Sequence, residues 1–140
     1  MKPQLDHEKL EVYQHAVQFT AWTEEFIALL PARAVRDQLD RASTSIPLNI
    51  AEGNGKFSIR DRCRYLEIAR GSAVECAACL DVAVAKKLVP AGAVTEGKER
   101  LLRIVSMVTG LIMSLNNRVS EEPAGYGTTE QEHEQEKEQE

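Results

Sequence analysis

Hydrophobic residues recur every three or four positions through most of this chain, as they do on one face of an amphipathic helix. Four segments show this period, at residues 6–30, 32–54, 58–88 and 94–119. Short connections with proline or glycine separate them, so consecutive helices are expected to be antiparallel neighbours. The pattern predicts an all-α protein, an antiparallel up-and-down four-helix bundle over residues 1–120.

Local signals place the ends of these helices. Asp6 is a candidate N-cap for the first segment, and Ser58 with Asp61 has the form of a capping box at the start of the third. Gly53 and Gly55 bracket the end of the second segment, where a left-handed residue usually closes the last turn.

Pro47 stands in the middle of segment 32–54. Because the apolar period continues past it through Ile46 and Ile50, we expect the helix to kink at Pro47 and not to end there. A polar stripe of Ser45, Asn49 and Glu52 runs beside the apolar one. This stripe is either a buried hydrogen-bonded network or the solvated edge of the helix.

Gly71 and Ser72 interrupt segment 58–88 with almost no side-chain bulk. A glycine in a helix costs up to about 1 kcal/mol relative to alanine, so the close approach of another helix would be a reason for it. We expect Pro47, Gly53 and the Gly71–Ser72 pair to form one packing contact between the second and third helices. Replacement of Gly71 by leucine would then cost about 1–3 kcal/mol. The polar neighbours would be structural: Asn49, Glu52, Ser72 and Glu75.

The net charge of −5 is unevenly distributed. Residues 121–140 contain eight glutamates and one lysine, a charge of −7, which leaves +2 for residues 1–120. Because residues 121–140 have no apolar face to bury, we expect them to form a disordered acidic tail. The weakly basic body is compatible with nucleic acid or an acidic partner.

Three cysteines without a secretion signal predict reduced thiols in a cytoplasmic protein. Cys76 and Cys79 form a C-x-x-C pair, but it lies mid-helix among alanines, which favours small core residues over a redox or zinc site. The longest apolar stretches are too short to span a bilayer, so no membrane association is expected.

No convincing nucleophile with its base, metal cage or phosphate-binding loop is present in the sequence, so we expect no cofactor and no enzymatic activity. Glu52, Glu67 and Glu75 could face the bundle interior, held there by serine or asparagine groups. The rival hypothesis is a small-molecule enzyme that uses Glu52 and Glu75.

Basic residues cluster around the start of segment 58–88: Lys56, Arg60, Arg62, Arg64 and Arg70. Arg33, Arg36 and Arg41 are possible neighbours from segment 32–54. Repeated on a ring, such a patch could hold RNA through several weak phosphate contacts. A solvated helix face is the alternative, since Asp61 and Glu67 offer partners in the same turns. Trp22 lies off the apolar stripe of its segment and is a candidate contact with a partner subunit.

Residues Leu39–Gly53, followed by Tyr65–Glu75, closely resemble the four-helix bundle family of 23S rRNA intervening-sequence proteins. The shared patterns are R-A-x-x-S-I-x-x-N-I-A-E-G and I-A-x-G-S-x-x-E, and the similarity covers about residues 10–115. In this chain their specified positions include Arg41, Ser45, Ile46, Asn49, Glu52, Gly53, Gly71, Ser72 and Glu75.

The resemblance implies a bundle that assembles into a homopentameric ring, in a family without an established enzymatic activity. It also implies a relation to the accessory proteins of diversity-generating retroelements, which form a basic ring that engages reverse transcriptase and RNA. We therefore expect an oligomeric scaffold, with RNA or nucleoprotein binding as the alternative.

Overall fold

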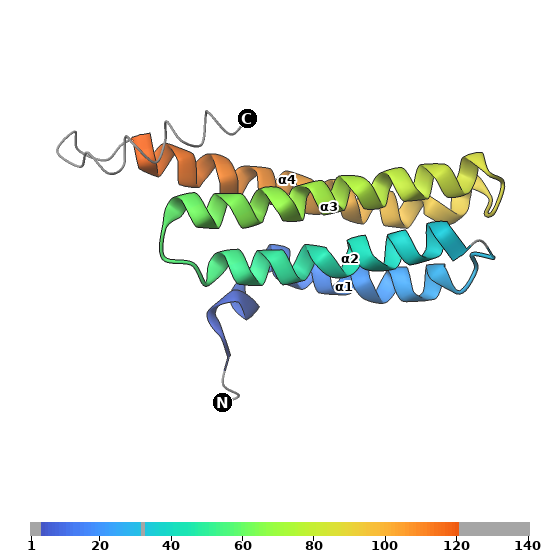
Figure 1. Cartoon of the computed structure of the whole chain (residues 1–140), viewed down its shortest axis with the longest axis horizontal. Coiled ribbons are helices and arrows are strands. Elements are labelled where there is room, and N and C mark those ends of the chain that lie inside the picture. The colour runs from blue at the N-terminus through green and yellow to red at the C-terminus, as the bar shows by residue number, and fades with distance from the viewer. Residues whose placement is uncertain (1–3, 32, 121–140) are drawn as a thin grey trace.

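The computed structural model describes residues 4–31 and 33–120, and it is a four-helix bundle, as the sequence predicts. The predicted acidic tail, residues 121–140, lies outside the described residues. The helices are α1 (Glu11–Ile27), α2 (Arg33–Asn54), α3 (Ile59–Ala85) and α4 (Thr95–Ser120), with short 3₁₀ helices η1 (Asp6–Lys9) and η2 (Ala91–Val94). Figure 1 shows the chain reversing direction at each connection, so that α2 and α3 run in opposite senses.

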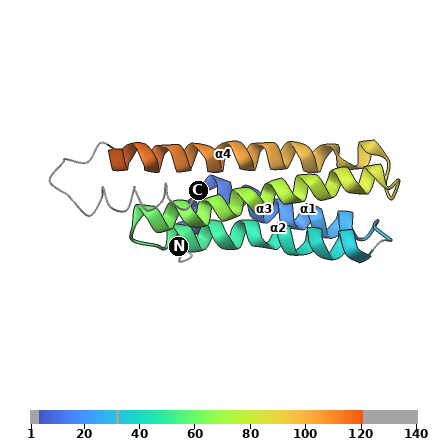
Figure 2. The same ribbon diagram turned by 45° about the horizontal axis from the view of Figure 1, so that its top comes forward.

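Each helix packs against two neighbours, α1 with α2 and α4, and α3 with α2 and α4. Figure 2 shows α2, α3 and α4 running along the same long axis. The apolar stripes meet in one core, in which Phe19, Leu39, Ile46, Leu80 and Ile104 are fully buried. Burial of these large side chains is the main driving force for association of the four helices.

The first long helix begins later than predicted, at Glu11 and not at Asp6. Leu10 adopts an extended conformation (ψ 125°), which separates η1 from α1. Asp6 does not cap α1, because it lies in η1 and the residue before α1 is Leu10. Its carboxylate instead accepts a hydrogen bond from the Asn54 amide at 2.8 Å. The N-terminal segment is thereby joined to the end of α2.

The start of α3 agrees with the predicted cap, since the Ser58 hydroxyl accepts a hydrogen bond from the Asp61 N–H at 3.0 Å. The predicted end at Leu88 is wrong: α3 ends at Ala85, and Lys87 has a positive φ of 59°. The Leu88 N–H donates to the Ala83 carbonyl, a bond of the Schellman C-cap. Similarly, Val94 belongs to η2, and α4 starts one residue later.

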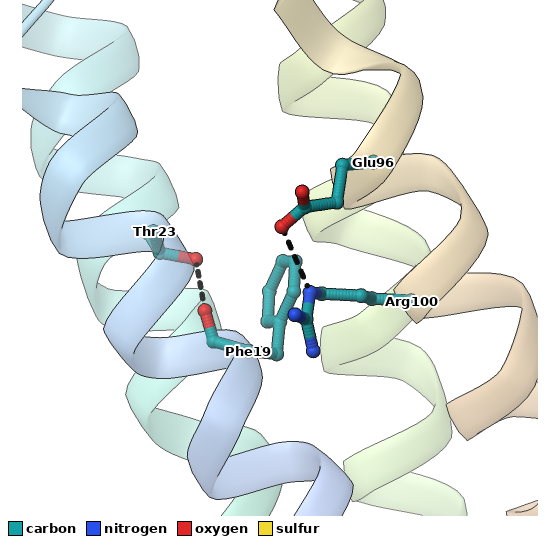
Figure 3. Close-up of polar contacts among 4 residues, drawn as sticks. All are labelled: Phe19, Thr23, Glu96 and Arg100. Atoms are coloured by element: carbon teal, nitrogen blue, oxygen red, sulfur yellow. Dashed lines mark hydrogen bonds and ion pairs between the residues drawn. The ribbon is translucent and has the colours of Figure 1, made fainter.

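The contact between α1 and α4 is shown in Figure 3, where the Phe19 ring points from α1 toward the turn of α4 that carries Glu96 and Arg100. The buried Thr23 hydroxyl donates to the Phe19 carbonyl at 2.9 Å, so it is satisfied within its own helix. On α4, Arg100 Nε donates to the Glu96 carboxylate at 3.2 Å.

Trp22 packs against other residues of this chain but stays half-buried, so its interpretation as a partner-subunit contact stays a prediction. Its ring stacks with Phe19 and Phe26 at centroid distances of 5.7 and 4.9 Å. It also lies against Gly97 of α4, where an added Cβ would be 2.6 Å from the ring atom Cζ3. Glycine at position 97 is therefore what allows α1 and α4 to approach at this point.

Candidate interaction surfaces

Three polar residues of the sequence signature meet where α2 packs against α3, a contact that we call the α2–α3 seam. They are Ser45 and Asn49 on α2 and Ser72 on α3, with Arg41 beside them. The hydroxyl oxygens of Ser45 and Ser72 lie 2.9 Å apart, and the Asn49 amide donates to the Ser45 hydroxyl at 2.9 Å and to the Ser45 carbonyl at 2.8 Å. These three side chains are half-buried.

The carboxylates do not take part in this network in the predicted way. Glu52, Glu67 and Glu75 are all exposed, so the expectation that they face the bundle interior is wrong. Each occupies a helical position outside the core stripe of its helix, where a charge keeps its hydration. The seam is thus joined by hydrogen bonds between uncharged side chains, and the three carboxylates stay in water.

Four signature residues of α2 are buried, namely Ala42, Ile46, Ile50 and Gly53, and so is Pro47 between them. The helix continues from Arg33 to Asn54 with Pro47 inside it, and the kink itself stays a prediction. Gly53 marks a close approach to α3, because an added Cβ would lie 2.8 Å from the Cβ of Tyr65. It does not close the helix by a left-handed conformation, since no described glycine has a positive φ.

Gly71 does not belong to the predicted packing contact. It is exposed, and an added Cβ would meet nothing within 4 Å. Position 71 lies between the core residues Ala69 and Ala73, two positions from each, and so points away from the core. The contact between α2 and α3 is made by Ser72, its neighbour, and by Gly53.

The thiols are embedded in the bundle. Cys63, Cys76 and Cys79 are buried and are not joined in disulfides. Burial, then the adjacent Cys79 and Glu75, raises the pKa of Cys76 to about 12, and burial also raises the pKa of Cys79. Protonated thiols are poor nucleophiles and metal ligands. Within residues 4–31 and 33–120, no group of three or more His, Cys, Asp or Glu could hold a metal ion.

The predicted basic cluster is engaged in local contacts at the start of α3. Arg62 Nε donates to the Lys56 carbonyl at 2.7 Å, and Arg64 lies 3.6 Å from the Asp61 carboxylate. The charged groups of Lys56 and Arg64 lie 5.2 and 5.4 Å from the Tyr65 ring centroid. Lys56, Arg60 and Arg62 are half-buried and Arg64 is exposed.

Further along α3, the exposed Arg70 donates from Nε to the Thr109 hydroxyl of α4 at 3.1 Å. Arg33 and Arg36 are not neighbours of the cluster, because α2 is antiparallel to α3 and carries them at its other end. The 18 residues between Arg36 and Asn54 correspond to about 27 Å of helix. Arg41 is exposed on the seam, where it lines a shallow groove with Ser45, Leu48 and Asn49.

Phe57, in the connection between α2 and α3, was not singled out by the sequence analysis. Its side chain is fully exposed (101%), between the half-buried Lys56 and Ser58. An aromatic ring left wholly in water at the edge of a basic cluster is available for contact with another molecule.

A second apolar stripe, on the solvent side of α3, was also missed. Exposed residues follow one another at spacings of three and four: Ile68, Gly71, Val74, Ala78, Val82 and Ala85. We call this set the outer α3 stripe. Its spacing is readable in the sequence, but the inner stripe of the same helix draws attention away from it.

A pocket of about 200 Å³ lies where the start of α3 and the ends of α2 and α4 meet. We call it the bundle-end pocket. Its lining residues are Leu10, Ile50, Gly53, Asn54, Arg62, Leu66, Leu111, Ser114, Leu115 and Arg118. They come from the start of α1, the end of α2, the start of α3 and the end of α4, so no continuous sequence motif reveals the site. None of them is a carboxylate.

The chain is a small helical bundle that carries its sequence signature along the α2–α3 seam. We recognise no catalytic centre among its described residues. The chain matches the family model described as 23S rRNA-intervening sequence protein over residues 8–110, and it belongs to that family.

A similar solved structure is a protein of unknown function from the S23 ribosomal protein family of Bacteroides thetaiotaomicron VPI-5482. The TM-score is 0.69 at 20% identity, over 72% of this chain and 97% of that one, and this likeness concerns the fold. Among curated proteins none matches the chain. None of the described helices combines the length and apolar character that a bilayer span requires.

Proposed function

We propose that this protein is a non-enzymatic scaffold that assembles with copies of itself through the outer α3 stripe. The observation that carries this proposal is the apolar character of α3 on both sides. Leu66, Ala73 and Leu80 fill the core, while Ile68, Val74 and Val82 keep 46, 50 and 40% of their surface exposed. A solitary bundle needs only the first set.

The composition of the stripe suits a second copy as the occupant. Gly71, Ala78 and Ala85 alternate with the larger residues, so another helix could approach closely along a length of about 26 Å. The exposed charges beside the stripe are of both signs, namely Arg64, Glu67, Glu75 and Lys86. A different surface of the next copy, with complementary charges, can then pack on the stripe around an apolar centre.

A closed ring is the assembly we propose, with five copies as the family resemblance implies, in which the outer α3 stripe of each copy packs against a different face of the next copy. In such a ring the α2–α3 seam would be repeated on every copy, beside the contact surface. The Ser45–Ser72 hydrogen bond would hold α2 and α3 in the same register in every copy.

Charge substitutions on the stripe test this proposal. Val74→Glu combined with Val82→Glu should reduce the assembly to monomers, because each glutamate would have to lose its hydration in the contact. Each monomer should still fold cooperatively, since both substituted side chains are already exposed in the single chain. The matched control is Leu102→Glu, at a 70% exposed apolar position on α4 outside the stripe. Unchanged assembly in the double variant would refute the assignment of the interface.

RNA or nucleoprotein binding is a second candidate function, favoured by the exposure of Phe57 next to Lys56. Single-stranded nucleic acid is held by cationic side chains together with rings on which bases stack. Binding of a single-stranded RNA by the full chain should then weaken steeply with salt and be reduced by Phe57→Ala. Arg60→Glu with Arg64→Glu should abolish it, whereas undetectable or salt-insensitive binding both by the full chain and by a chain truncated after Ser120 would rule this candidate out.

A further inference from the structure

The bundle-end pocket has an apolar lining and a basic rim. Side chains from four elements form the apolar part, among them Leu10, Ile50, Leu66 and Leu115. Arg62 and Arg118 supply positive charge, and no carboxylate lines the pocket. A volume of about 200 Å³ exceeds the share of a single water, about 30 Å³, several-fold. The site can therefore take an apolar or aromatic side chain that is flanked by acidic groups.

The basic rim is held by the local structure. Arg62 is fixed at the start of α3 by its hydrogen bond to the Lys56 carbonyl at 2.7 Å. The Lys56 ammonium lies 5.2 Å from the Tyr65 ring centroid, close to the same turn. Arg118 lies in the last turn of α4, which ends at Ser120. Cations placed on rigid elements bind an acidic segment with a small loss of side-chain entropy.

We infer that residues 121–140 of this chain occupy the bundle-end pocket. They follow Ser120 directly, two positions after Arg118, and they carry eight glutamates and one lysine. Their only aromatic residue is Tyr126, and six extended residues span up to about 20 Å, enough to reach the pocket. The Tyr126 ring enters the apolar part, and the glutamates pair with Arg62, Arg118 and Lys56.

This contact does not depend on self-assembly through α3. Its consequence is regulatory: an acidic segment at Arg62 and Lys56 neutralises part of the basic cluster. A polyanion that approached the cluster would first have to displace it. Because the segment is linked to α4, its effective concentration is high without strong individual contacts.

Zero-length carbodiimide cross-linking of the full chain tests the inference, since the reagent joins a lysine to a carboxylate in direct contact. Peptides from residues 121–140 should be linked to Lys56 several-fold more often than to Lys86, an exposed lysine at the opposite end of α3. The preference should decline at high salt, which screens the contact. Equal yields at Lys56 and Lys86 would overturn the inference.

Substitutions define which groups are responsible. Tyr126→Ala, and Arg62→Ala combined with Arg118→Ala, should each lower the Lys56 yield several-fold, whereas Arg103→Ala, an exposed arginine on α4, should not. If the double variant does not fold, Arg118→Ala alone serves, because its side chain is exposed. A Lys56 yield unaffected by Tyr126→Ala and Arg118→Ala would contradict the assignment.

A mixture of isotope-labelled and unlabelled chains identifies the source of the segment. If each segment occupies the pocket of its own chain, the two peptides of a cross-link carry the same isotope. Cross-links whose two peptides carry different isotopes as often as the same isotope would show that the segment comes from another copy and would overturn the inference.

Discussion

The hydroxyl oxygens of Ser45 and Ser72 lie 2.9 Å apart and join the middle of α2 to the middle of α3. Asn49 donates to the same Ser45 hydroxyl, so three half-buried polar groups satisfy one another at the helix boundary. Ser45 and Asn49 belong to the first part of the sequence signature and Ser72 to the second. Their spatial contact gives a physical reason for the presence of both parts in one chain.

We expect Ser72→Ala to lower the free energy of unfolding by about 0.5–1.5 kcal/mol, because it removes a partly buried hydrogen bond. Urea denaturation measures the change, and Ser106→Ala, at an exposed position on α4, should stay within about 0.5 kcal/mol of the parent protein. Ser45→Ala should be coupled to Ser72→Ala in a double-mutant cycle. If the changes in unfolding free energy of the two substitutions were strictly additive, the Ser45–Ser72 hydrogen bond would be contradicted.

The effect of a glycine substitution on stability should depend on whether the glycine lies at a helix contact. Gly53→Ala and Gly97→Ala place a Cβ against Tyr65 and Trp22, and we expect each to cost about 1–3 kcal/mol through overpacking. Gly71→Ala and Gly110→Ala meet nothing within 4 Å and should raise the stability of their helices by up to about 1 kcal/mol. Thermal unfolding of the four variants distinguishes the two pairs when it is measured in the Val74→Glu/Val82→Glu background, in which no other copy packs on Gly71. Destabilisation by Gly71→Ala would restore the original hypothesis of a close approach there.

Stability should depend on alkaline pH through Cys76. Its thiol keeps the proton in the folded state, with a pKa of about 12 against 9.0 for the ordinary group. The stabilisation is therefore complete below pH 9 and is lost as the pH rises toward 12, by about 1.4 kcal/mol per pH unit at most. Between pH 8 and 10 the parent protein should lose more unfolding free energy than Cys76→Ala. Identical pH dependence in the two would contradict the burial of this thiol.

The helical period was sufficient to predict four helices, because each inner stripe is long and regular. The exposure of Gly71 was also accessible from the sequence, since it lies two positions from both Ala69 and Ala73 on the core face. The packing of Trp22 on Gly97 was not, because it depends on how α1 and α4 are placed relative to each other.

The candidate surfaces likewise include one that the sequence predicts and one that only the tertiary structure reveals. The spacing of three and four residues between small and apolar positions from Ile68 to Ala85 would have predicted the outer α3 stripe from the sequence alone. The bundle-end pocket combines Leu10 with Arg118, which stand at opposite ends of the described chain. Such a site becomes visible only when the topology brings the helix ends together. By contrast, the predicted antiparallel order already places Arg33 and Arg36, suggested as possible neighbours, at the end of α2 away from the basic cluster.

Sedimentation velocity of the full-length protein at micromolar concentration tests the proposed scaffold most directly. One chain has a mass of 15.6 kDa. Self-assembly through the outer α3 stripe predicts a discrete species of several times that mass, five times for the proposed ring, which persists on dilution across the micromolar range. A single species with the mass of one chain would contradict the account.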